Sequence, residues 1–198
     1  MRGVNDWLLL HPDAAAAIAT IFLTIFAAVQ ILLEIARHRD RRHSAAIEAQ
    51  GPAWLARRSM EASMREATRV APFDWARNMS PEPLERLQQQ MLETLRLASI
   101  AGGKYARAGR RAFTAFIAIA DRINTVNTLP PAAMRRSLGG TAIVALDTDR
   151  ANTLVGEAFE HLDSAVSGLS VIAPRQPDEG TLPKRAEVFL HANGRVTA

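Results

Sequence analysis

Glu157 and His161 are the side chains in this sequence that most resemble a pair of metal ligands. A Glu and a His one helical turn apart can supply two ligands to a divalent metal from one face of a helix. Both residues fall at the edge of an apolar face, which suits a solvated helix edge equally well. We therefore predict no metal and no cofactor.

Four cations follow Gly102-Gly103 at helical spacings that suit a row of phosphates: Lys104, Arg107, Arg110 and Arg111. The glycines and Lys104 are residue types of a phosphate-binding loop, but they lack its spacing and follow a predicted helix rather than a strand. Tyr105 stands beside the cations, yet no recognised nucleic-acid-binding motif accompanies them. Nucleic-acid binding is therefore an alternative and not the expected function.

The composition excludes several kinds of chemistry. The chain contains no cysteine, so disulfides, thiol catalysis and cysteine-bound metals are ruled out. Hydrophobic residues make up 48% and charged residues 22% of the chain, as in domains that bury a core of their own. Alanine is the main small apolar residue and favours closely packed helices. We predict an all-α fold.

The most distinctive element lies near the N-terminus. Residues 14–33 form an apolar run without a charge, and at 1.5 Å per residue a helix of this length spans about 30 Å, the thickness of a bilayer core. We predict a short N-terminus over residues 1–13 and a transmembrane helix over residues 14–36, with Trp7 as an interfacial contact. A cleaved signal peptide is the alternative, but the run is too long and Glu34-Ile35-Ala36-Arg37 is a poor cleavage site.

Arginines give the orientation of this helix. Arg2 is the one arginine that precedes the helix. Four arginines follow it immediately: Arg37, Arg39, Arg41 and Arg42. The excess of cations on the C-terminal side predicts that this side is cytoplasmic and the N-terminus outside. We expect the four arginines to contact anionic lipid headgroups, in a single-pass protein of a bacterial inner membrane.

The same helix carries a pattern that suits self-association. Small residues recur every fourth position: Ala16, Thr20, Thr24 and Ala28. Such a ladder lets transmembrane helices approach closely, and Gln30 beside it can form a hydrogen bond between helices. Alanine-rich segments also produce such ladders by chance.

The cytoplasmic part is predicted as a basic helical stalk over residues 37–50, ended by Gly51-Pro52, and a bundle of about four main helices over residues 51–173. A helix at about 53–70 places Met60 and Met64 on one face and Arg57 with other arginines on the opposite, solvated face. Phe73 and Trp75 are expected to plug the core from a loop.

Further helices follow. Ser80 is predicted to cap a helix that ends at Gly102-Gly103, and the next helix covers about 104–127. Residues 141–146 suit either a short strand or the start of a helix.

The last helix, at about 148–173, has an apolar seam with alternating steps of four and three: Ala151, Val155, Ala158, Leu162, Ala165 and Leu169. Such a seam suits packing against a second protein or, equally, a core helix of a monomeric bundle.

The final segment, residues 174–198, is predicted to be a linker and tail. Asn193-Gly194 is a turn signal that suits a short C-terminal β-hairpin.

No catalytic constellation stands out, so we expect a non-enzymatic, membrane-tethered interaction, scaffold or regulatory module. Its partners would be lipids and a protein, or a second copy of the chain, and no small-molecule ligand is indicated. An enzyme with a pocket between helices is the alternative.

Overall fold

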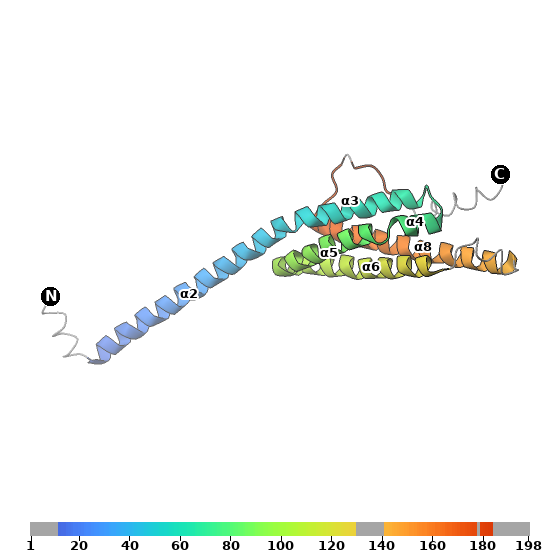
Figure 1. The fold of residues 1–198 in the computed structure, drawn as a ribbon. Helices are drawn as coiled ribbons and strands as arrows, with labels where there is room; N and C mark the ends of the chain where they lie inside the picture. Colours follow the sequence, from blue (N-terminus) through green and yellow to red (C-terminus); the bar gives the residue numbers. More distant parts are fainter. Residues whose placement is uncertain (1–11, 130–140, 178, 184–198) are drawn as a thin grey trace. The chain divides into compact units, whose positions relative to one another are not determined.

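A computed structural model describes residues 12–129, 141–177 and 179–183, and all regular structure in those ranges is helical. The all-α prediction is confirmed. The helices are α2 (Pro12–Glu48), α3 (Gln50–Ala67), α4 (Pro72–Asn78), α5 (Glu82–Ala101), α6 (Gly103–Thr128) and α8 (Thr141–Ile172), shown in Figure 1. The expected C-terminal hairpin lies outside the described residues.

The chain falls into two parts, one ending at His43 and one beginning at Ser44. The first part contains α2 up to His43, and the second contains the last turn of α2 and the other helices. Ala45 and Ala49 are already buried, so the packed domain begins before the predicted boundary at residue 51.

α2 ends at Glu48, close to Gly51-Pro52, where the sequence predicts the end of the stalk, and α3 begins at Gln50 with no loop between them. The amide of Ala49 donates to the carbonyl of Ala45 at 3.0 Å, and the amide of Ala53 donates to that of Ala49 at 3.2 Å. Pro52 therefore lies inside the first turn of α3. Proline is tolerated there, because the first amides of a helix have no partner in the helix.

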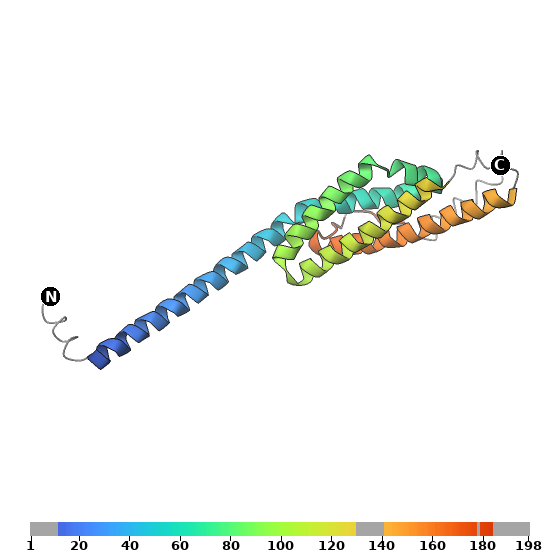
Figure 2. The same ribbon diagram turned by 60° about the horizontal axis from the view of Figure 1, so that its bottom comes forward.

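Four long helices of the second part lie side by side: α3, α5, α6 and α8 (Figures 1 and 2). Their facing residues form one core, in which α6 and α8 have the most extensive contact. Alanine fills much of this core, while Met60, Met64, Met91, Phe116 and Leu162 supply its volume. The small side chains let the helix axes approach one another, as the composition predicts.

α6 and α8 meet most closely at Gly168. A Cβ atom built on Gly168 would lie 3.0 Å from the carbonyl oxygen of Ala108 and 3.1 Å from the Cβ of Ala112. A glycine is therefore needed at this position for steric reasons, although glycine weakens a helix.

The structure decides two local questions that the sequence raises. Residues 141–146 are the first turns of α8, so of the two structures that their sequence suits they form the helix start and not the strand. Phe73 and Trp75 belong to α4 rather than to a loop. Trp75 does plug the core: it is 1% exposed, and its indole N–H donates to the carbonyl and the hydroxyl of Ser63, each at 3.0 Å.

The start of α5 also differs from the expected cap. The N-cap residue is Pro81, and no side chain forms a capping hydrogen bond there. The turn into α6 uses positive φ angles at Gly102 and Gly103, 75° and 54°, a conformation that favours glycine.

The close contact at Gly168 gives a testable prediction. Gly168→Ala should destabilise the domain by about 1–3 kcal/mol, because the added methyl group overpacks a backbone contact. The midpoint of urea unfolding, followed through Trp75 fluorescence of the full chain in a mild detergent, measures this change.

Gly51→Ala is the matched control. A Cβ atom on Gly51 would meet nothing within 4 Å, so this change should stabilise the helix by about 0.5–1 kcal/mol. Equal effects of the two substitutions would contradict the packing of α6 on α8.

Candidate functional site

The apolar surface of α2 is the largest feature that the fold leaves uncovered. Ten large apolar side chains of this helix are 45–69% exposed: Ile21, Phe22, Leu23, Ile25, Phe26, Val29, Ile31, Leu32, Leu33 and Ile35. By length and composition α2 is apolar enough to cross a membrane, with a mean hydropathy of 2.1 and none of that window buried. It is therefore not the core helix of a soluble domain.

The small-residue ladder lies on this exposed helix, since Ala16, Thr20, Thr24 and Ala28 are all exposed. The Thr20 hydroxyl donates to the carbonyl of Ala16, and the Thr24 hydroxyl to that of Thr20, each at 2.8 Å. Both threonines satisfy their donors within the helix, which lowers the cost of placing them in an apolar medium. Gln30 is exposed as well.

Four of the five predicted lipid contacts fall within the described residues. Arg37, Arg39, Arg41 and Arg42 are all exposed on α2, after its apolar run. They form what we call the arginine collar. Trp7 lies outside the described residues.

The seam of α8 is not a free surface. All six of its residues are at most 2% exposed and lie in the core of this chain: Ala151, Val155, Ala158, Leu162, Ala165 and Leu169. Of the two interpretations that the seam allows, burial supports the core helix. A partner must therefore bind elsewhere.

A buried ion cluster lies between α3 and the segment that follows α8. Arg57 is predicted on a solvated face, yet it is 0% exposed. Its Nη1 donates to Oε1 of Glu61 at 2.9 Å and to Oε2 of Glu179, while its Nη2 donates to Oε1 of Glu179 at 2.9 Å. The Arg57 guanidinium thus forms a bidentate pair with the carboxylate of Glu179, 122 residues later in the sequence.

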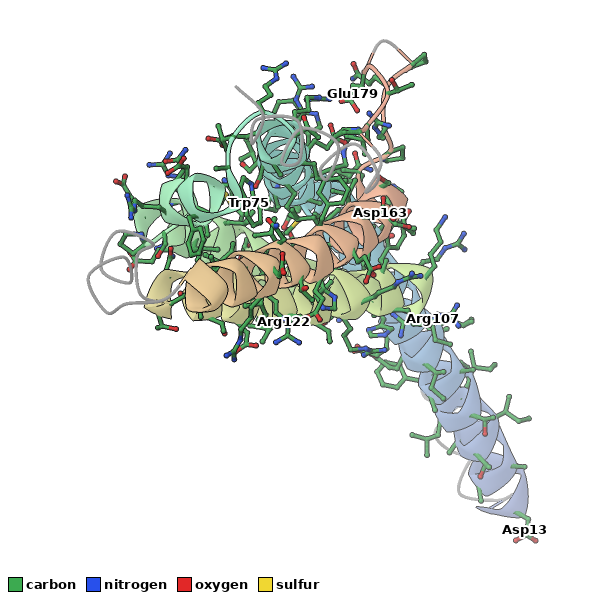
Figure 3. The ribbon with its side chains drawn as sticks, turned by 90° about the vertical axis from the view of Figure 1, so that its right-hand side faces the viewer. Asp13, Trp75, Arg107, Arg122, Asp163 and Glu179 are labelled. Carbon is green, nitrogen blue, oxygen red and sulfur yellow. The ribbon has the colours of Figure 1, made fainter. Side chains whose placement is uncertain are left out.

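Residues 173–177 and 179–183, which we call the strap, are held on α3 by this cluster. Arg175 lies 3.2 Å from Oε1 of Glu61 through its Nε, and its Nη2 donates to the carbonyl of Gly180 at 2.6 Å. Leu182 packs against the core. Figure 1 shows the strap passing over α3, and Figure 3 labels Glu179 on it.

The cluster determines the charge states of its members. The hydrogen bond from Arg57, and secondarily its charge, holds the pKa of Glu179 below its ordinary value, against the opposing effect of burial. The hydrogen bond to Glu179 and the negative charges of Glu61 and Glu179 raise the pKa of Arg57. These two pKa shifts favour the charged forms of Arg57 and Glu179 at neutral pH.

The four cations of α6 form a different kind of surface. Lys104, Arg107, Arg110 and Arg111 are all exposed. Within the described residues, Arg111 makes one long hydrogen bond to the Ser164 hydroxyl, at 3.5 Å, and none of the four has an ion pair. We call these residues the basic face. Figure 3 labels Arg107 on it.

The hollows of the domain are shallow. One of about 330 Å³ between α6 and α8 is lined by Arg111, Thr114, Ala115, Ala118, His161 and Ser164. The carboxylate of Glu157, expected beside His161, instead lies 2.7 Å from Nε of Arg122. Among the described residues, no group of three His, Asp or Glu side chains is placed to hold a metal.

Comparison with protein-family models, with curated proteins and with solved structures finds no match to this chain. The function is therefore argued from the residues themselves.

The ion cluster leads to a prediction about stability. Arg57→Met should destabilise the domain by about 3–5 kcal/mol, because it leaves the buried carboxylate of Glu61 without its main partner. The double variant Arg57→Met with Glu61→Met should recover part of that loss, since the buried carboxylate of Glu61 is then removed as well, while Glu179 keeps Arg175 at 3.6 Å. Urea unfolding of the full chain in detergent measures both.

Arg58→Met is the control for this pair. Arg58 is exposed and stacks 5.5 Å from the ring centroid of Trp54, so its loss should cost below about 1 kcal/mol. A cost for Arg57→Met that is no larger than for Arg58→Met would contradict a buried cluster.

The lowered pKa of Glu179 predicts that acid weakens the strap. Because the folded pKa lies below the ordinary 4.5, the contact contributes its full stability above that value. The contribution is lost as the pH falls through the folded pKa. Hydrogen exchange of residues 174–183, corrected for the intrinsic rate at each pH, should therefore rise relative to α6 on acidification. Glu179→Gln should show the faster exchange already at neutral pH, and unchanged exchange in this variant would contradict the role of Glu179.

Proposed function

We propose that this chain is a single-pass membrane protein that tethers a helical interaction domain to the cytoplasmic face of an inner membrane. The exposed apolar surface of α2 is the observation that carries the proposal. Ten large apolar side chains on one helix are far more than a soluble surface normally leaves uncovered. A bilayer covers all sides of such a helix at once, and the helix satisfies its own backbone polar groups.

The arginine collar supports the orientation. Its four cations follow the apolar run and are exposed, and an excess of cations marks the cytoplasmic side of a span. Each arginine near an anionic leaflet contributes about 1 kcal/mol, so the collar also favours keeping the end of the span at the lipid surface.

Binding rather than catalysis is proposed as the role of the domain. Two hollows of the described domain are open, and the buried cluster of charges at Arg57 is closed by the strap. Since the α8 seam is buried, the ladder on α2 is the remaining predicted surface for a protein partner. A second copy of the chain is the partner that such a ladder fits.

The first test is insertion. The full chain should stay in membranes after carbonate washing, and a reporter fused to its C-terminus should be active only in the cytoplasm. Replacing the four collar arginines with glutamine should lower the fraction with this orientation, because the charge bias is lost. A chain stripped from vesicles by carbonate, or a reporter active only outside, would rule out the proposal.

The second test, of self-association through the ladder, introduces single cysteines into a sequence that has none. Thr24→Cys on the ladder should form disulfide-linked dimers in native membranes several-fold more readily than Phe22→Cys. Position 22 lies at nearly the same depth on the opposite side of the helix. Equal dimer yields at the two positions would exclude the ladder as the contact.

A further inference from the structure

The basic face of α6 has no counter-charge within the described chain. From Gly103 to Ala120 the helix carries Lys104, Arg107, Arg110 and Arg111 and no acid. On the neighbouring helix α5, by contrast, two exposed arginines are paired: Arg86 with Glu82 at 2.9 Å and Arg96 with Glu93 at 2.7 Å. Four unneutralised cations within about 10 Å of helix attract anions.

This face lies at the end of the bundle where α3 begins. The pKa of Arg96, in the last turns of α5, is raised mainly by its hydrogen bond to Glu93 and further by the charge of Glu48. Glu48 immediately precedes α3, so the end of α5 is near the start of α3. The turn at Gly102 then brings the first residues of α6 to the same end, as Figures 1 and 2 show.

That end is also the one at which the chain enters the domain. The apolar run ends at Leu33, and the domain begins at Ser44. A helical connection of this length spans roughly 15 Å. For a chain anchored by α2, a connection this short raises the effective concentration of headgroups at the end of the domain that carries the basic face.

We infer that the basic face of α6 binds the anionic phospholipid headgroups of the membrane that holds the anchor, as a second lipid contact beyond the arginine collar. The inference rests on the proposed function. Lipid is favoured over nucleic acid because Tyr105 is no free stacking platform. Its ring packs against the core, and the Lys104 ammonium lies 5.2 Å from the ring centroid.

The test uses the full chain in nanodiscs of either neutral or anionic phospholipid. A fluorescent label on Ser99→Cys, in the last turn of α5 and exposed, reports contact with a quencher on the lipid headgroups. Quenching should be several-fold stronger in anionic than in neutral nanodiscs and should fall at high salt. A label on Gln89→Cys, about 15 Å further along the same helix, should show little difference.

Two matched double variants assign the effect to the face. Arg107→Gln with Arg110→Gln should abolish the difference between anionic and neutral lipid at the Ser99 label. Arg69→Gln with Arg77→Gln removes the same charge from exposed positions after α3 and in α4 and should leave the difference intact.

The outcomes separate this inference from the proposed function. A chain that carbonate strips from vesicles refutes the anchor. A chain that stays inserted but shows equal quenching in both lipids, or equal effects of the two double variants, refutes the second contact alone. If Arg107→Gln with Arg110→Gln instead lowers retention of an oligonucleotide in neutral nanodiscs, while lipid charge has no effect, the face binds nucleic acid and the inference is overturned.

Discussion

The contact between α6 and α8 is the packing constraint on which the rest of the domain depends. At Gly168 the backbone of α8 approaches the Ala108 carbonyl so closely that a Cβ atom would lie 3.0 Å from its oxygen, tighter than most such contacts. Because α6 and α8 bury their facing sides against each other, the residues of the α8 seam lie in the core and the opposite side of α6 lies outside. The basic face is exposed for this reason. The end of α8 is also fixed, and the strap starts from it.

The strap shows how a polar interaction completes an alanine-rich core. Arg57 and Glu61 are buried in a wall of α3 that would otherwise be apolar, and Glu179 reaches them from beyond the last helix. A buried ion pair often adds little net stability, because desolvation offsets the attraction. It does penalise alternative arrangements, since a strap placed elsewhere takes Glu179 away from Arg57 and leaves Glu61 as the carboxylate that pairs with it. The cluster thus specifies where the strap lies on α3.

The sequence was a good guide to features that depend on neighbouring residues. The all-α class, the apolar run of α2, the core-facing seam of α8 and the plugging role of Trp75 all follow from local spacing. It failed where a distant residue decides the outcome. Arg57 looks solvated on a helical wheel, because its partner Glu179 is 122 residues away. The only local signal was Glu61, one turn after Arg57, a spacing that exposed pairs share. The helix end near Gly51-Pro52 was visible in the sequence. The start of α3 before the proline was not, since a proline that follows one helix and a proline in the first turn of the next look the same.

Charge and apolar surface are arranged in one consistent order along the chain. The uncovered apolar helix comes first and the exposed collar follows it. In the proposed arrangement, a single span alone would leave the domain free to tilt and rotate about its linker. A second set of cations, at the end of the bundle where the domain begins, would limit this freedom at little cost, because the tether already restricts the distance over which the lipid must be found.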